Sequence, residues 1–217
     1  MVLTLPKKRD MYTKQAKSEG YRSRAAYKLL QIDKKFKLFH GNQTVIDLCG
    51  APGGFSQIAR DRSVGKARIF LVDIARIKSI PNITEIIKGD ITELHTILQL
   101  QKSLEKHEAN NNEIIVLADC SPNVSGHWIT DHARQIWLAE VALGISNYFL
   151  AEKFLTKVFQ GEYFQELLEK IKASYQNVKT YKPPTSRKQS AEIYIIAINN
   201  KNRGTDRYNR NHLVEDE

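Results

Sequence analysis

Four side chains suited to moving a proton lie in four separate segments of the sequence, namely Lys28, Asp119, Lys157 and Glu192. Lys157 interrupts the apolar run 154–159, and a lysine is rarely found in such a run unless its surroundings serve a purpose. A lysine whose pKa is lowered by burial or by a second cation can take a proton from a hydroxyl group. An ammonium can instead stabilise the alkoxide that forms. These residue types therefore favour the activation of a hydroxyl group as a nucleophile.

Each of these residues also has an ordinary interpretation. Lys28 could be a surface lysine of a basic helix, and Asp119 could cap the turn that follows it. Glu192 could pair with Arg187, and Lys157 could extend from the edge of a sheet into water. Residue types alone leave these alternatives open, because the four residues make a site only where the fold brings them together.

A second group of residues is typical of a nucleoside-binding site. The apolar run 44–49 stops at the glycine-rich turn 50–54, and helix-like residues follow it. Glycines allow a backbone to approach a ligand closely. Acidic residues stand at the ends of this run and of the next two predicted strands: Asp47, Asp73 and Asp90. Ligands of doubly wound folds bind beyond the carboxyl ends of the strands, so these residues predict a cofactor site there.

The acids and the turn favour S-adenosylmethionine over other nucleoside cofactors. Asp73 is placed to accept hydrogen bonds from a ribose diol, and Asp90 is placed to reach the edge of an adenine. The dinucleotide pattern GxGxxG is absent, and so are the lysine and Ser/Thr of a phosphate-binding loop. These absences argue against an NAD-dependent dehydrogenase and a nucleotide triphosphatase. A tight strand-to-helix turn without a ligand remains the alternative.

Strand-like and helix-like segments alternate along the chain. We expect strands at 44–49, 68–73, 83–87, 113–119, 154–159, 178–181 and 191–198. We expect helices at 10–38, 55–59, 92–106, 131–150 and 163–175, the first broken at Gly20 and capped again at Ser23. This alternation predicts an α/β fold with a parallel sheet and helices on both faces. Residues 1–198 would form one domain, and 199–217 a polar, loose tail.

The positive charge is concentrated near the N-terminus. Of the net charge of +9, residues 1–40 carry +8, from eleven Lys/Arg against three acids. Such a basic segment, at about 7–40, attracts polyanions, of which nucleic acid is the usual one. A solvated helical face explains the same pattern equally well.

Several classes of protein are excluded or disfavoured. No apolar run approaches the 18 or so residues of a membrane span, and the first residues lack the form of a signal peptide. The two cysteines, Cys49 and Cys120, predict neither a disulfide framework nor a metal pair, which indicates a reducing cytosol. The histidines show no ligand spacing, so we expect no metal. We expect a cytoplasmic monomer.

Six blocks of the sequence resemble the FtsJ-like family of RNA 2′-O-methyltransferases: YRSRAAYKL, DLCGAPGGFSQ, KGDI, SPNVSG, KVFQG and SRKQSAEIY. The resemblance runs from about Lys8 to Ala197. It implies S-adenosylmethionine as cofactor, a Rossmann-like sheet of seven mostly parallel strands with the last antiparallel, and a Lys-Asp-Lys-Glu tetrad. By motif the tetrad is Lys28, Asp119, Lys157 and Glu192. In it Lys157 would be the central base or the group that stabilises the alkoxide.

The resemblance also implies the residues around the cofactor and the RNA. The cofactor residues would be Gly53, Phe55, Asp73, Asp90 and Asp119. The family often has Trp where Phe55 stands, and a phenyl ring keeps the aromatic wall without the indole N–H. Contacts to RNA phosphates are expected from Arg22, Arg24, Arg187 and Lys188. Trp128 could stack on a base or pack within its own loop.

The blocks SPNVSG and KVFQG resemble the ribosomal branch of the family most closely. They predict methylation of a uridine ribose in large-subunit ribosomal RNA, with the RNA or the large ribosomal subunit as partner. The opening residues resemble the branch that acts on transfer RNA, which is the second hypothesis. A third is an RNA-binding protein that keeps the fold without turnover, although an intact tetrad argues against it.

Overall fold

The computed structural model describes residues 11–63, 67–109, 113–122, 125–187 and 189–203. Its elements, in chain order, are α1 (Met11–Ser18), α2 (Ala25–Phe36), β1 (Gln43–Leu48), α3 (Gly54–Arg62), β2 (Arg68–Asp73), β3 (Glu85–Lys88), α4 (Leu94–Lys106), β4 (Glu113–Ala118), α5 (Trp128–Tyr148), β5 (Lys153–Phe159), α6 (Phe164–Ser174), β6 (Tyr175–Tyr181) and β7 (Glu192–Asn200). No helix in these ranges is long and apolar enough to cross a membrane.

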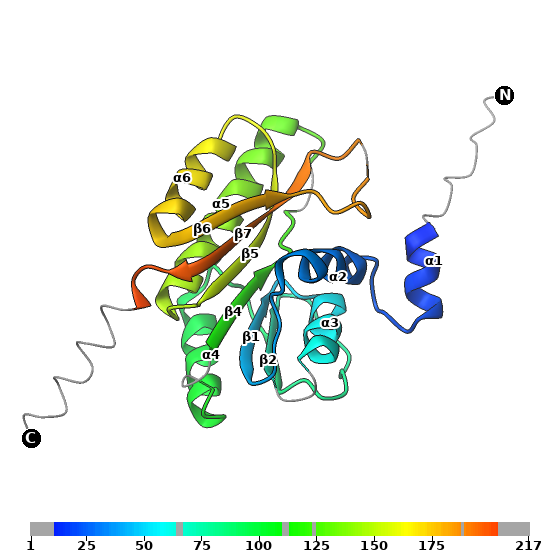
Figure 1. Ribbon diagram of the computed structural model, residues 1–217, viewed down its shortest axis with the longest axis vertical. Coiled ribbons are helices and arrows are strands. Elements are labelled where there is room, and N and C mark those ends of the chain that lie inside the picture. The colour runs from blue at the N-terminus through cyan, green and yellow to red at the C-terminus, as the bar shows by residue number, and fades with distance from the viewer. Residues whose placement is uncertain (1–10, 64–66, 110–112, 123–124, 188, 204–217) are drawn as a thin grey trace, which may run out of the picture.

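The seven strands form one sheet in the order β3-β2-β1-β4-β5-β7-β6. The pairs from β3 across to β5 are all parallel, whereas β7 runs antiparallel to both β5 and β6. The chain leaves β1 toward one edge through β2 and β3, and then crosses back to β4 beside β1 (Figure 1). The predicted α/β, Rossmann-like sheet of seven mostly parallel strands is confirmed. Its order reverses between β1 and β4, and such a reversal is where ligands bind.

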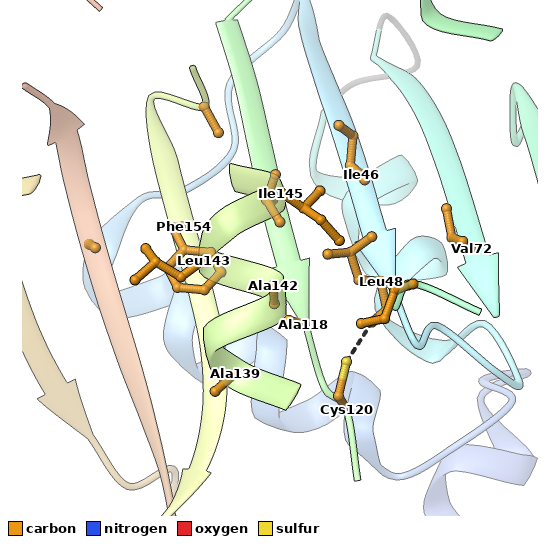
Figure 2. Packing of buried hydrophobic residues seen from close by; sticks show 14 of the residues in the cluster. Ile46, Leu48, Val72, Ala118, Cys120, Ala139, Ala142, Leu143, Ile145 and Phe154 are labelled. Atoms are coloured by element: carbon orange, nitrogen blue, oxygen red, sulfur yellow. Dashed lines mark hydrogen bonds between the residues drawn. The ribbon is translucent and has the colours of Figure 1, made fainter. Parts of the chain in front are cut away.

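Helices cover both faces of the sheet, as predicted. One hydrophobic core lies between the sheet and α4, α5 and α6, and the other lies between the sheet and α2 and α3 (Figure 1). On the first face, Ala142 and Leu143 of α5 lie over Ala118 of β4 and Phe154 of β5 (Figure 2). The central strands are buried on both sides, which is why their sequences read as continuous apolar runs.

The expected N-terminal helix is two helices. It is broken at Gly20, which adopts the left-handed backbone angle φ 80°. The expected cap at Ser23 is wrong: Arg24 precedes α2, and no side chain caps the helix. The Ser23 hydroxyl instead packs against Gly54, at the turn after β1, where a side chain would collide with it. The residue therefore joins the N-terminal segment to the predicted cofactor turn.

The two cysteines form a disulfide, which corrects the expectation of two unpaired thiols. Cys49 follows β1 and Cys120 follows β4, and their Cα atoms lie 5.0 Å apart. The strands are direct parallel neighbours, with Leu48 opposite Ala118, so residues 71 positions apart meet at one edge of the sheet. Figure 2 also shows Cys120 Sγ close to the Leu48 carbonyl oxygen, at 3.9 Å. The disulfide removes the cysteine-based reason for expecting a reducing compartment.

The C-terminal strands are longer than expected. β6 begins at Tyr175, directly after α6. This tyrosine is buried, and its hydroxyl is hydrogen-bonded to that of Ser146 at 2.7 Å. β7 continues to Asn200, two residues into the expected tail. Residues 204–217 of that tail, and residues 7–10 of the basic segment, lie outside the described residues.

Candidate active site

Two lysine–carboxylate pairs stand at the carboxyl ends of the central strands. Lys28 Nζ of α2 donates to both carboxylate oxygens of Glu192, at 2.6 and 2.7 Å. Lys157 Nζ of β5 lies 3.2 Å from Asp119 Oδ1. Both lysines are buried, with 6% and 5% of their surface exposed. Ammonium groups withdrawn from water to this extent need charged or polar partners, and each lysine has a carboxylate.

Lys157 makes two hydrogen bonds besides its ion pair. Its Nζ donates to the Asp119 carbonyl oxygen at 2.8 Å and to Ser121 Oγ at 2.5 Å, in addition to the ion pair with the Asp119 carboxylate. An ammonium has three N–H donors, and these bonds use two of them. A hydroxyl that approaches Nζ can therefore use the third N–H, or it can replace Ser121, whose neutral side chain can rotate away.

Tyr194 joins the two pairs into one cluster. Its hydroxyl donates to Asp119 Oδ1 at 2.8 Å, and Lys28 Nζ lies 5.8 Å from the centre of its ring. Tyr194 is the register partner of Lys157 across β5 and β7. Burial, followed by the charges of Asp119 and Glu192, raises the pKa of this phenol well above its ordinary value. The phenol therefore stays protonated and remains a hydrogen-bond donor to Asp119.

The structure thus brings the four predicted residues together. It overturns the pairing of Glu192 with Arg187 as the main alternative, because Glu192 is bonded by Lys28 and by Ser186 Oγ at 2.9 Å. It also overturns the surface position suggested for Lys28. Tyr194, Ser121 and Ser186 were not predicted. Tyr194 had a usable signal, since alternation along a strand puts it on the same face of β7 as Glu192.

The glycine-rich turn after β1 is tightly packed. Gly53 has φ 110°, and a side chain there would collide with Ile80. A side chain at Gly50 would approach Leu71 Cγ to 2.7 Å. The protein's own packing therefore requires glycine at both positions, and the turn by itself does not identify a ligand. The nature of the ligand has to come from the acids around it.

The predicted cofactor acids surround this turn. Asp73 ends β2 and is buried; its two oxygens accept the N–H groups of Ala51, at 2.8 Å, and Ala75, at 2.7 Å. Asp90 is exposed, and its Oδ1 accepts both bonds from Thr92, which leaves Oδ2 for another donor. Each carboxylate oxygen can accept more than one bond. Both acids therefore retain acceptors for hydroxyl or amino groups of a ligand.

Asp47 is the most deeply buried acid of the site. None of its surface is exposed, its Oδ2 accepts the Ser56 hydroxyl at 2.6 Å, and its Oδ1 has no partner in the described residues. Burial raises its pKa to about 7, against the opposing effect of the Ser56 bond, and the charges of Asp119 and Asp73 add to the rise. A ligand that carries positive charge near β1 would favour the ionised form of this carboxyl.

Phe55 has a different place from the one expected. Only 2% of its surface is exposed, and its ring lies in the core between α3 and the sheet, 6.4 Å from the ring of Tyr194. It supports Tyr194 from within the core. In the described residues no cluster of His, Cys, Asp and Glu is placed to hold a metal.

The predicted RNA contacts divide into two groups. Arg22 is engaged within the protein: its guanidinium donates to the carbonyl oxygens of Pro52, Lys78 and Ser79 at 3.3, 2.6 and 2.5 Å. It holds the loop after β2 against the glycine-rich turn, and its contact with an RNA phosphate stays a prediction.

Arg24 directly precedes α2, one turn before Lys28, and Arg187 follows Ser186, whose hydroxyl donates to Glu192. Burial lowers the pKa of Arg24, and the charge of Arg187 lowers it further, while Glu192 opposes both effects. Lys188 lies outside the described residues.

Comparison with known proteins gives a consistent picture. Residues 21–200 match the FtsJ-like methyltransferase family. The chain is 44% identical, over 87% of its length and 71% of the relative, to a protein of Methanothrix thermoacetophila named ribosomal RNA large subunit methyltransferase E. A protein of the same name from Archaeoglobus fulgidus is 42% identical, over 87% of this chain and 95% of its own length.

Solved structures agree with the sequence matches. The crystal structure of a ribosomal RNA methyltransferase from Plasmodium falciparum superposes with a TM-score of 0.73 at 26% identity, over 83% of this chain and 98% of that one. The chain is a methyltransferase and belongs to the FtsJ-like methyltransferase family.

Proposed function

We propose that this methyltransferase uses S-adenosylmethionine to methylate the 2′-hydroxyl of a ribose in RNA, with a uridine of large-subunit ribosomal RNA as its substrate. The observation that carries the proposal is the cluster of Lys28, Asp119, Lys157 and Glu192 at the carboxyl ends of the strands. This is where a ligand of such a sheet binds. The names of the relatives support the choice of RNA.

The residues at the turn fit S-adenosylmethionine by their chemistry. Asp47, Asp73 and Asp90 are carboxylates with acceptor capacity left over, and Arg22, a cation beside the turn, is bonded to carbonyls. A site of this composition suits a cationic, hydroxyl-bearing ligand and repels phosphate. We assign the ribose diol to Asp73 and the adenine edge to Asp90. When bound, this cofactor would supply a methyl group on a sulfonium, from which a neutral thioether is a good leaving group.

The protein's task is then to prepare the hydroxyl group. We place the ribose 2′-oxygen at Lys157 Nζ, where it replaces Ser121 as a hydrogen-bond partner. There Lys157 either takes the hydroxyl proton as an amine or, as an ammonium, stabilises the negative charge that grows on the oxygen. Asp119 fixes the direction of Nζ. The pair of Lys28 and Glu192 closes the other side of the cluster and positions the ribose, since holding reactants in place lowers the barrier substantially.

The test is methyl transfer from radiolabelled S-adenosylmethionine, with large ribosomal subunits, naked ribosomal RNA and transfer RNA side by side. We expect label in ribosomal RNA from the wild-type protein and none from Lys157→Ala. Label in transfer RNA alone would keep the chemistry and replace the substrate by the second hypothesis. A wild-type protein that binds the cofactor tightly and labels no RNA would contradict the proposal and support an RNA-binding role without turnover.

Two further properties are part of the proposal. We expect a monomer, because the tetrad and the acids of the cofactor turn all come from one chain. Light scattering at micromolar concentration checks this directly. We also expect the protein in the cytoplasm, where ribosomal RNA is accessible to it, and fractionation of cells that express a tagged chain tests the location.

A further inference from the structure

Four aromatic rings stack in a row where β5 ends and α5 begins. Trp128 stacks on both Phe159 and His132, with ring centres 6.0 and 5.8 Å away and planes inclined by 26° and 9°. His132 stacks in turn on Tyr163, at 5.7 Å and 15°. Nearly parallel rings at these separations are offset, so each covers only part of its neighbour. Trp128 remains 52% exposed and Tyr163 37% exposed.

The row is held rigidly from behind. His132 is 2% exposed, and its Nε2 accepts the backbone N–H of Tyr163 at 3.2 Å, which puts the ring proton on Nδ1. Burial lowers the pKa of His132, so the ring stays neutral at physiological pH. A side chain at Gly161 would come within 2.7 Å of this imidazole. Position 161, in the turn after β5, therefore needs glycine, because any side chain there would displace the ring of His132.

Ser125 and Gly126, just before Trp128, are fixed as well. The carboxylate of Asp131 accepts the backbone N–H groups of Ser125, at 2.8 Å, and Gly126, at 3.1 Å. These bonds, together with the Ser125 hydroxyl at 2.8 Å, lower the pKa of Asp131 and keep it ionised. The row of rings and the bonds of Asp131 thus position the indole before any ligand arrives. A surface organised in advance loses little conformational entropy when it binds.

The row of rings adjoins the catalytic cluster. Phe159 lies two residues beyond Lys157 on β5 and is the register partner of Glu192. Gln135 of α5 donates to the Lys157 carbonyl oxygen at 2.9 Å, which ties the helix that carries Trp128 to the strand that carries Lys157. The positive charge of Arg24 acts on Glu192, and Arg187 directly follows Ser186, whose hydroxyl donates to Glu192 at 2.9 Å. Aromatic and cationic groups therefore meet beside the proposed ribose position.

We propose that Trp128, backed by Phe159, His132 and Tyr163, is a stacking platform for an unpaired base of the RNA substrate. The inference rests on the proposed RNA substrate and adds the way in which the nucleotide beside the reacting ribose is held. Bases stack on exposed aromatic side chains irrespective of sequence, and cations nearby bind the phosphates. The platform would hold the strand open at the site and would not read the base edge.

The experiment compares Trp128→Ala with Trp137→Ala. Both tryptophans lie on α5 and both are 52% exposed, but Trp137 is outside the row of rings. We expect Trp128→Ala to weaken binding of single-stranded oligouridylate, and to raise KM for ribosomal RNA, on the order of tenfold. Its affinity for S-adenosylmethionine should be unchanged. Trp128→Phe should retain most of the binding, and Trp137→Ala should match the wild type.

Fluorescence gives a second readout that does not depend on removing Trp128. The sequence has two tryptophans, so Trp137→Phe leaves Trp128 as the sole tryptophan reporter. We expect oligouridylate to quench its emission, and an abasic ribose-phosphate chain of the same length to leave it unchanged. Equal quenching by both chains, or full RNA affinity in Trp128→Ala, would overturn the platform alone. Absence of methyl transfer from the wild type to any RNA would overturn the proposed function, and the platform with it.

Discussion

Strands β4 and β5 carry two buried lysine–carboxylate pairs, one at each end. At the carboxyl ends Lys157 faces Asp119 at 3.2 Å, and at the amino ends Lys153 faces Glu113 at 2.9 Å. The two lysines are similarly buried, at 5% and 9% exposure. They lie on the same strand, four positions apart. A buried lysine in a strand is therefore no mark of catalysis by itself.

The surroundings of the two pairs differ. The amino-edge pair has only structural partners around it, because Lys153 also donates to the Leu38 carbonyl at 2.8 Å, and Glu113 also accepts Gln43 Nε2 at 2.7 Å and pairs with His40 at 3.1 Å. The carboxyl-edge pair adjoins a second lysine–acid pair, the glycine-rich turn and the aromatic row. Ligands of such a sheet bind at the carboxyl ends of its strands. The direction of the strands thus marks the Lys157 pair as part of a site and the Lys153 pair as structural.

The largest expected effect separates the two lysines by activity. Lys157→Met should lower the rate of methyl transfer to ribosomal RNA by about 10²- to 10⁴-fold, because it removes the group at the reacting oxygen. Lys157→Arg keeps the charge but cannot act as a base, so partial activity would assign Lys157 to stabilising the alkoxide. Single-turnover rates with saturating cofactor measure the chemical step.

Lys153→Met is the matched control. It should leave the rate of methyl transfer per folded molecule within about threefold of the wild type, and lower the free energy of unfolding by about 1–3 kcal/mol, because Glu113 and the Leu38 carbonyl lose a buried donor. Urea unfolding measures the loss. A large drop in the rate for Lys153→Met would remove the distinction between the two pairs.

The next effect in size concerns the disulfide, which joins β1 to β4 at the carboxyl ends of these strands, where the site lies. Reduction should lower the free energy of unfolding by about 2–4 kcal/mol, because Cys49 and Cys120 close a loop of 71 residues in the unfolded chain. Urea unfolding with and without reductant measures it. The double variant Cys49→Ser/Cys120→Ser should show no response to reductant, and an equal response in both proteins would contradict the bond.

The remaining effect is a pair of opposite pH dependences. Asp47 binds its proton more tightly in the folded state, where its pKa is about 7 against 3.8. The protonated carboxyl of Asp47 therefore adds to the free energy of unfolding below pH 4. This contribution is lost as the pH rises toward 7, at up to about 1.4 kcal/mol per pH unit. Asp47→Asn should flatten this part of the stability curve, as measured by urea unfolding across the range.

Glu113 should behave in the opposite way. Burial raises its pKa, but the bonds from Lys153 and Gln43 outweigh burial and hold the pKa below 4.5. The ionised carboxylate of Glu113 adds to the free energy of unfolding above pH 4.5, and this contribution is lost as the pH falls further. Glu113→Gln should therefore reduce the loss of stability at acidic pH. Because Glu113 is partly exposed, the effect is smaller. The same sign of change in both variants would contradict the comparison.

The sequence predicts much of the fold for a clear physical reason. The central strands are buried on both faces, so their apolar runs are unbroken, and β2 (Arg68–Asp73) has the predicted bounds. β6 is an edge strand with exposed polar residues; its first residue, Tyr175, was assigned to the preceding helix, and the next two residues were assigned to neither element. Its pattern is weak because only one face is packed.

The site was predicted in part. The tetrad could be named from its motif blocks, but its contacts could not, because they join residues as far apart as 28 and 192. The same holds for the disulfide and for Arg22, whose carbonyl partners lie in two distant loops. Long-range pairing depends on strand order, and a sequence read segment by segment does not contain it.

The most direct test of the central claim is to locate the transferred methyl group. Ribosomal RNA labelled by the wild-type protein is hydrolysed with alkali, which cleaves next to every free 2′-hydroxyl. Transfer to the ribose predicts that the label survives in an alkali-resistant dinucleotide beginning with uridine, and that Lys157→Met yields none. Label recovered in mononucleotides would place the methyl group on a base and would contradict the assignment of the tetrad to a ribose hydroxyl.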